Sequence, residues 1–306
     1  MRNLYRPLRL MRQAGVTLIE LAVTIALIGI LAALMVQFIY PVFSYIDTSR
    51  RAALSDSADT ALRRIGRDVR LALPNSARVA LAGGVYYLEF MLVRTGGRYR
   101  AEVDAAATNT CNDGASATPA NDVLVFGAAD TCFKTIGSFP NIAQVTTSDY
   151  VVVYNLQFGT PNADAYQFAG TGGNKSLVSS ATAGAGQDRI NFASNTFTYE
   201  SPGNRFFIIE GPVSYICAPS ATPGAGTLTR RWGYTISATQ PTTTFTGGSS
   251  ALMASGVTAC SMTYDLSVTS QGAGLVTLSL QLSMQDSKGA TESVNLYHTV
   301  HVNNVP

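Results

Sequence analysis

An uncharged apolar run near the N-terminus constrains this chain more than any other feature of its sequence. Between Leu21 and Ile39 there are 19 residues without a charged side chain, and only Thr24 and Gln37 are markedly polar. A helix of this length, at about 1.5 Å per residue, spans roughly 28 Å, which is close to the hydrocarbon thickness of a bilayer. The run therefore predicts one membrane-spanning helix.

The basic residues around this run predict its orientation. Residues 1–15 contain four arginines and no acid, and no comparable basic cluster follows until Arg50 and Arg51. Because positively charged flanks stay in the cytoplasm, we expect a single-pass protein with a cytoplasmic N-terminus and the remaining chain outside. The rest of the chain has 17 of the 21 basic residues and all 19 acidic residues, so its charge is nearly balanced. The composition therefore indicates no nucleic-acid partner.

Four cysteines lie far downstream of the apolar run, namely Cys111, Cys132, Cys217 and Cys260. None forms a C-x-x-C pair, so neither a zinc site nor a thioredoxin-like motif is indicated. An even number with wide spacing is typical of two disulfides in an oxidising compartment, which agrees with the orientation above. Three pairings are possible. We favour Cys111–Cys132 with Cys217–Cys260 because these close the shorter loops, and four buried free thiols remain the alternative.

Glu20 stands at the entrance to the apolar run, in the stretch Gly15-Val16-Thr17-Leu18-Ile19-Glu20. A carboxylate in hydrocarbon is costly unless another group neutralises it. A cleaved secretory signal would have a shorter apolar core and a small-residue cleavage site, which is not found here. A plain signal anchor that holds a periplasmic protein or enzyme stays possible, but it does not explain the glutamate.

The order basic leader, glycine, G-[apolar]-T-L-x-E and uncharged run resembles the type III signal of type IV pilins and type II secretion pseudopilins. The resemblance implies that a prepilin peptidase cuts between Gly15 and Val16 and methylates the new N-terminus at Val16, where most members have Phe. It also implies that Glu20, fifth in the cut chain, pairs with the N-terminal amine of a neighbouring subunit during assembly. A glutamate that merely reaches the membrane interface is the simpler alternative.

The segment after the run predicts an amphipathic helix up to about residue 73. Pro41 should end or bend the membrane helix, because proline lacks a backbone donor. Apolar residues then recur at helical spacing and form one stripe: Ile46, Leu54, Ala58, Ala61, Leu62, Ile65, Val69 and Ala72. Three ion pairs are expected on the solvent side: Asp47–Arg51, Asp59–Arg63 and Arg64–Asp68. The arginines at 63, 64, 67 and 70 fit a solvated face better than a binding patch.

Beyond about residue 80 the apolar period changes to two, which predicts strands. The expected strands are 85–93, 99–103, 122–126, 149–156, 204–210, 213–216, 226–234, 261–268, 274–284 and 292–302, with long loops at 104–121, 160–188 and 238–256. The predicted fold class is therefore α+β, with a long N-terminal helix packed on a largely antiparallel β head. We divide the chain into a leader (1–15), a transmembrane or filament-core helix (16–40), an amphipathic helix (41–73) and a head (74–306).

Blocks at both ends of the chain look like the MshO-like minor pilins of mannose-sensitive haemagglutinin pili. They are "SRRAALSDSADTALRRIGRDVRLALPNS", "VSYICAP", "GTLTRRWGY", "ACSMTYD" and "HTVHVNNVP". The J-type minor pseudopilins of type II secretion share this layout, and the middle of the chain, roughly 100–200, carries no resemblance. Cys217 and Cys260 fall in these blocks, so the resemblance favours that pair.

The sequence indicates no catalytic site, metal site or cofactor. His298 and His301 are three apart on an expected strand, so they point to opposite faces and cannot share one metal ion. Residues 111–122 gather Asn112, Asp113, Asn121 and Asp122, but they do not match an EF-hand, and a polar turn fits better than a calcium site. Trp232 is expected in the core rather than on a ligand-binding face.

The resemblance implies a minor pilin that is built into, or primes, a type IV pilus of the mannose-sensitive haemagglutinin kind. It further implies a bacterial inner-membrane location with a periplasmic head, followed by a place on the pilus or cell surface. The implied partners are other pilin subunits, the prepilin peptidase, the inner-membrane assembly machinery and membrane lipid. The alternatives are a J-like minor pseudopilin and a signal-anchored periplasmic protein or enzyme, and an adhesive head is compatible with either filament.

Overall fold

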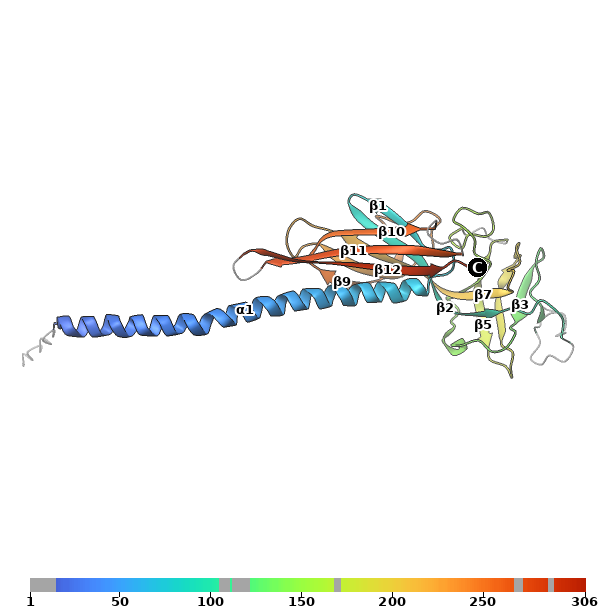
Figure 1. Cartoon of the computed structure of the whole chain (residues 1–306). Helices are drawn as coiled ribbons and strands as arrows, with labels where there is room; N and C mark the ends of the chain where they lie inside the picture. The colour runs from blue at the N-terminus through green and yellow to red at the C-terminus, as the bar shows by residue number, and fades with distance from the viewer. Residues whose placement is uncertain (1–14, 105–110, 112–121, 168–171, 267–271, 286–288) are drawn as a thin grey trace, which may run out of the picture. The chain divides into compact units, whose positions relative to one another are not determined.

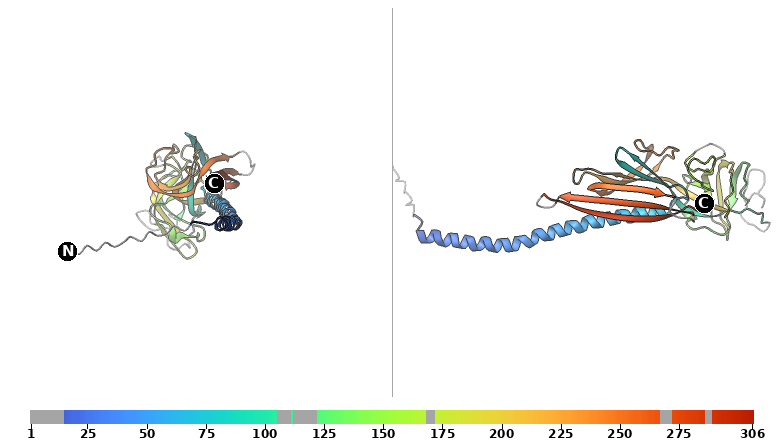
Figure 2. Two further views of the ribbon diagram at one scale, coloured as in Figure 1. Left: turned by 90° about the vertical axis from the view of Figure 1, so that its left-hand side faces the viewer. Right: turned by 45° about the horizontal axis from the view of Figure 1, so that its top comes forward.

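A computed structural model describes residues 15–104, 111, 122–167, 172–266, 272–285 and 289–306, with backbone alone for 38–47. The chain divides into two compact units, one up to Arg50 and the other from Arg51 to Pro306. Figures 1 and 2 show a helix as the main element of the first unit and a β-rich second unit. The predicted α+β class is confirmed, with an apolar N-terminal helix followed by a mostly antiparallel β region.

The helix α1 runs from Leu18 to Arg70 without interruption. Of the two outcomes expected at Pro41, an end or a bend of the helix, the end is therefore wrong. Proline removes one backbone donor, but the residues on both sides of Pro41 remain helical. The helix ends three residues before the expected boundary at 73. Leu71 and Ala72 donate their N–H groups to the carbonyls of Asp68 and Val69, which closes the last turn.

The apolar stripe on the second part of α1 lies in the core of the head. Its buried members in the helix are Leu54, Ala58, Ala61, Leu62, Ile65 and Val69. They share one cluster with Leu88, Tyr215, Leu228 and Leu278, which come from four different strands. This face therefore packs as the 3.6-residue period predicts. Ile46 and Asp47 lie outside the residues whose side chains are described.

Within the described ranges the larger sheet has nine strands in the order β1-β2-β7-β4-β5-β6-β3, with β8 on β7 and β9 on β8. The bounds are β1 Arg78–Ala82, β2 Val85–Arg98, β3 Asp130–Lys134, β4 Tyr150–Val153, β5 Lys175–Thr182, β6 Arg189–Asn195, β7 Arg205–Ala218, β8 Thr227–Tyr234 and β9 Gly247–Ser255. A short 3₁₀ helix occupies Ile142–Gln144. Every one of these strand pairings is antiparallel.

The strand β7 changes partner along its length and so connects two halves of the sheet. Its first part, Phe206 to Ile209, pairs with β4, and its last part, Val213 to Ala218, pairs with β8. Gly211 lies between them with φ 120°, a backbone conformation that residues other than glycine rarely adopt. The glycine thus permits the break in strand register at which β7 changes from one partner strand to the other.

A second sheet contains β10 (Val257–Asp265), β11 (Ala273–Gln285) and β12 (Thr291–Asn303) in that order. It lies along the second part of α1 (Figure 1). The alternation expected in 274–284 is present, because Val276, Leu278, Leu280 and Leu282 are buried. The turn expected at Lys288-Gly289 falls partly outside the described residues.

The strand predictions fail where residues are small and polar or where loops resemble strands. The segments 99–103 and 122–126 are not strands, and only isolated bridges form at Tyr99 and Phe126. The segments 204–210 and 213–216 are one strand, β7. Five strands were missed: β1, β3, β5, β6 and β9, of which β5 and β9 lie inside expected loops. Serine- and alanine-rich strands such as β9 carry little β propensity, so pairing with a neighbour fixes their conformation.

Candidate functional site

The residues before α1 form an exposed segment that the rest of the described chain does not cover. Gly15, Val16 and Thr17 lie outside the helix, and all three are exposed. A Cβ atom added at Gly15 would meet nothing within 4 Å. The peptide bond between Gly15 and Val16 is therefore not shielded by any described residue.

Thr17 is the N-cap of the helix. The backbone N–H of Glu20 donates to Thr17 Oγ1 at 3.3 Å, and the N–H of Leu21 donates to the Thr17 carbonyl at 3.1 Å. Threonine followed three residues later by glutamate is the spacing of a capping box. Glu20 also places its negative charge in the first helical turn, where the helix dipole favours it. The sequence reading missed this local role, although the T-x-x-E spacing carries its signal.

The helix beyond this cap is apolar and uncovered. The stretch Leu18–Gln37 is long and apolar enough to cross a membrane. Every side chain in it is exposed, including Leu18 at 86% and Ile19 at 73%. An apolar surface of this length is unfavourable in water, so lipid or another protein has to cover it. The described part of this chain supplies neither.

Glu20 is the one charged residue in this span. Its side chain is exposed, and among the described residues no salt bridge involves it. The four leader arginines belong to residues 1–14, which lie outside the described residues. The described chain thus leaves the carboxylate available to a group from outside.

Comparison with known proteins finds a match to a model of the prokaryotic N-terminal methylation motif over residues 10–36. The match supports a type IV pilin-like or pseudopilin-like signal. It includes Gly15, Val16 and Glu20, and with the apolar helix it indicates a membrane-anchored protein. No curated protein and no solved structure matches the chain.

Further along the sequence, a buried charged group attaches α1 to the head. Asp68 Oδ2 accepts hydrogen bonds from Arg230 Nε at 2.8 Å and from the Tyr215 hydroxyl at 2.7 Å, and Arg64 Nε lies 3.7 Å from Oδ1. The expectation that Asp68 lies on the solvent side is therefore wrong, since its side chain is only 12% exposed. The expected pair Asp59–Arg63 is confirmed, at 2.6 Å. Helical spacing alone cannot show a partner 162 residues away.

A second buried group supports the loop between β8 and β9. Arg78 donates to Glu89 at 2.6 Å and to the carbonyls of Ser237 and Ala238, while Tyr234 donates to Glu89 at 2.7 Å. Burial raises the pKa of Glu89 above its ordinary value, although the charge of Arg78 acts in the opposite direction. The arginine thus joins the loop to the sheet.

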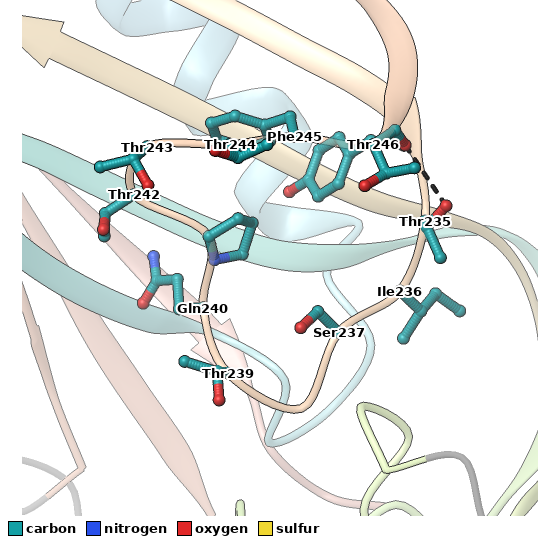
Figure 3. A pocket seen from close by; sticks show the side chains of 12 residues that line it. Thr235, Ile236, Ser237, Thr239, Gln240, Thr242, Thr243, Thr244, Phe245 and Thr246 are labelled. Carbon is teal, nitrogen blue, oxygen red and sulfur yellow. Dashed lines mark hydrogen bonds between the residues drawn. The ribbon is translucent and has the colours of Figure 1, made fainter.

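This loop borders an open hollow of about 470 Å³ lined by residues 234–237, 239 and 240–246. Figure 3 shows hydroxyl-bearing side chains around it, among them Thr239, Thr242, Thr243 and Thr244. Thr235 Oγ1 donates to the Thr246 carbonyl at 3.3 Å where the two ends of the loop meet. These groups are neutral, and the loop brings no nucleophile and base together.

The four cysteines form two disulfides, Cys111–Cys132 and Cys217–Cys260. The first connects β3 to a residue beside the undescribed stretch 112–121. The second connects β7 of the larger sheet to β10 of the smaller one. The second bridge therefore holds together the two sheets that share the core with α1.

The two histidines, the described residues of 111–122 and Trp232 lie among contacts that support the fold. His301 is exposed, whereas His298 lies against Gly66 of α1. Asp122 is buried, accepts from the Cys111 N–H at 2.8 Å and lies 3.7 Å from Lys134 Nζ, so its carboxylate is engaged by protein groups. Asn112, Asp113 and Asn121 lie outside the described residues. Within the described ranges no three His, Cys, Asp or Glu side chains gather as metal ligands. Trp232 is partly buried and packs on the main core.

Proposed function

We propose that this chain is a minor pilin, built into or priming a type IV pilus of the mannose-sensitive haemagglutinin kind. One observation carries the proposal. An exposed Gly15-Val16 bond precedes a capped, uncovered apolar helix with Glu20 in its first turn, and a methylation motif matches this region. The choice among pilus systems rests on the resemblance of the end blocks of the sequence.

In the proposed processing step a prepilin peptidase hydrolyses the bond after Gly15 on the cytoplasmic side. The leader 1–15 leaves with a new carboxylate at Gly15, and Val16 becomes the N-terminal residue. Its amine then takes a methyl group from a sulfonium methyl donor, which leaves as the thioether. Because the helix begins at Leu18, the new amine lies one residue before the N-cap Thr17. A methylated secondary amine remains protonated near neutral pH, so it brings a positive charge to the entrance of the membrane helix.

Glu20 is proposed to pair with such an amine. In one chain the Val16 amine and Glu20 are four residues apart at the same helix end, so a subunit alone in the membrane has its own amine nearby. Association offers the amine of a neighbouring subunit instead. An ion left without a partner in a low dielectric costs several kcal/mol, on the order of 3–5, so the pair favours correctly matched subunits. The apolar helices of the subunits then cover one another.

The head is proposed to lie on the periplasmic side, where disulfides form, and then on the pilus or cell surface. The proposed partners are other pilin subunits, the prepilin peptidase, the inner-membrane assembly machinery and membrane lipid. Adhesion by the head is compatible with this place. The J-like minor pseudopilin is the second candidate, since the same helix and β head suit a type II secretion pseudopilus.

Intact-mass measurement of the membrane form tests the proposal. In a strain with active prepilin peptidase we expect loss of residues 1–15 and gain of one methyl group. Gly15→Leu should keep the whole leader and provides the control. A wild-type chain that retains residues 1–15 beside other processed pilins would overturn the proposal. Purified pili that contain the processed chain favour the pilin role, and a chain required only for type II secretion favours the pseudopilin.

A further inference from the structure

A basic groove lies between the last turns of α1 and the strand β12. It has a volume of about 520 Å³, and its lining has three arginines and one acid: Asp59, Thr60, Arg63, Gly66, Arg67, Arg70 and His298. Figures 1 and 2 show the end of α1 running beside β12. All of these residues belong to the unit that begins at Arg51. The groove thus lies wholly within that unit.

A close approach between helix and strand forms the floor of this groove. A Cβ atom added at Gly66 would lie 2.9 Å from His298 Nε2 and 3.3 Å from Val300 Cγ2. Glycine therefore lets the imidazole lie against the helix backbone. The arginines rise from the helix beside this contact, at intervals of four and three residues along one face.

The described part of the chain matches the positive charges in the groove only partly. Arg63 pairs with Asp59 at 2.6 Å, and Arg64 lies 3.7 Å from Asp68. Arg67 and Arg70 are exposed, and no carboxylate among the described residues forms a salt bridge with either. Both complement the helix dipole, since they lie in the last turn. That role uses the end of the helix and leaves the outward side of each guanidinium open.

The same face of α1 carries two negative charges nearer its N-terminal end. Asp56 is exposed, and the Asp59 side chain is 48% exposed. Asp56 and Arg67 are separated by 11 residues, as are Asp59 and Arg70. Eleven residues make about three helical turns and span roughly 16 Å, so all four side chains lie on one face. A parallel copy of the helix, shifted by this distance, would place both aspartates opposite both arginines.

We propose that the basic groove receives the Asp56 and Asp59 side chains of a second copy of this chain, parallel and shifted by 11 residues. Arginine suits this contact because its planar guanidinium binds a carboxylate through two donors. Asp59 exchanges Arg63 for the other copy's Arg70, and an exposed ion pair costs at most about 1 kcal/mol to give up. The contact is head-to-tail, because one copy supplies its aspartates and the other its arginines.

An antiparallel pair would also match the charges, with Asp56 opposite Arg70 and Asp59 opposite Arg67. The parallel arrangement is preferred because the apolar helices of both copies then enter the same membrane from the same side. This choice rests on the proposed function. The offset differs from the four residues between Val16 and Glu20, so the amine of a different neighbour serves Glu20.

Disulfide trapping in the full-length chain tests this contact. Each native cysteine is already in a disulfide, so introduced cysteines supply the free thiols. Asp56→Cys and Arg67→Cys, on differently tagged copies in one membrane, should give a mixed disulfide under mild oxidation. The remaining pair, Asp59 with Arg70, keeps the register. The yield should fall several-fold when oxidation is carried out in high salt, because salt screens exposed charges.

Two controls make the result decisive. Arg63→Cys with Arg67→Cys lies on the same face but out of register, and it should give little product. Asp56→Cys with Arg70→Cys reports the antiparallel pair, and a higher yield there would overturn the proposal. Absence of the mixed disulfide in inserted chains, or capture of Arg67→Cys by a different protein, would overturn it as well.

The intact mass of the same samples separates this proposal from the proposed function. Trapped dimers that retain residues 1–15 would keep the contact and reject pilin processing. Processed chains without trapped dimers would do the reverse.

Discussion

Arg230 Nε lies 2.8 Å from Asp68 Oδ2, so a strand of the sheet holds a carboxylate of the helix by a buried ion pair. The Tyr215 hydroxyl donates to the same oxygen at 2.7 Å, and the Arg230 guanidinium lies over the ring of Trp232. Burial and the Asp68 charge both raise the pKa of Tyr215, so its hydroxyl remains a donor throughout the physiological range. The helix is thus attached through specific donors as well as through its apolar stripe.

Asp68→Asn should destabilise the head by about 3 kcal/mol, because it leaves the Arg230 charge buried without a counter-ion. Arg63→Ala removes an exposed ion pair of the same helix and should cost less than about 1 kcal/mol. Urea unfolding of both variants measures the difference. Equal stabilities would mean that Asp68 does not fix the helix to the sheet.

Glu20→Gln should insert into the membrane and lose its leader as the wild type does, yet enter filaments poorly. Glutamine preserves the shape of the side chain and the Thr17 cap, whereas it removes the charge proposed to meet an amine. Thr17→Ala is the matched variant, since it weakens the cap by about 1 kcal/mol and keeps the carboxylate. The proportion of each variant in sheared filaments gives the readout. Wild-type incorporation of Glu20→Gln would refute the pairing.

The stability of the head should rise with pH above about 8 because of Lys175. Its ammonium is buried and donates to the carbonyls of Ala165 and Gln167 at 2.6 and 2.7 Å. Burial lowers the pKa of Lys175 from 10.5 to about 8, although Asp164 acts in the opposite direction. Between these values the unfolded chain binds more protons, so raising the pH favours the folded state. Below pH 8 both states are protonated and this contribution is constant.

Lys175→Met should lack this rise. The free energy of unfolding of the wild type, minus that of Lys175→Met, should increase by about 1–2 kcal/mol between about pH 7 and pH 9.5. Urea titrations at several pH values measure it, and parallel curves for the two proteins would contradict the prediction. Absolute stabilities do not enter the comparison, so any packing cost of methionine cancels.

Gly226→Ala should destabilise the head by about 3 kcal/mol or more. An added Cβ would come within 1.8 Å of the Val257 carbonyl oxygen, and the chain at 257 is held by a hydrogen bond back to the Gly226 carbonyl. At Gly173 an added Cβ meets nothing within 4 Å, so Gly173→Ala should be close to neutral. Thermal unfolding of the two variants distinguishes a backbone clash from the general effect of replacing glycine.

The helix and its signal were readable from sequence because their determinants are local. The 3.6-residue apolar period in the second part of α1 is carried by Ala58, Leu62, Ile65 and Val69, and each of these is buried as predicted. Pro41 shows the limit of such local rules, because the surrounding helix outweighs one lost donor.

Partners that lie far apart in the sequence were not readable, since nothing near Asp68 indicates Arg230. Strand β9, Gly247–Ser255, has small side chains and an exposed surface, so its identity depends on pairing with β8. The sequence therefore predicted the elements with a strong period of their own, and it missed the contacts and strands that only the folded chain defines.

The contact of α1 with the head has a mechanical consequence. From the Arg51–Glu292 ion pair to the approach of Gly66 to His298, the helix lies lengthwise along β12. A load applied along the helix axis therefore acts on all of these contacts at once, in shear, and does not peel them apart one by one. The buried contacts of Asp68 with Arg230 and Tyr215 would therefore have to break together with the others before the helix could slide along the head.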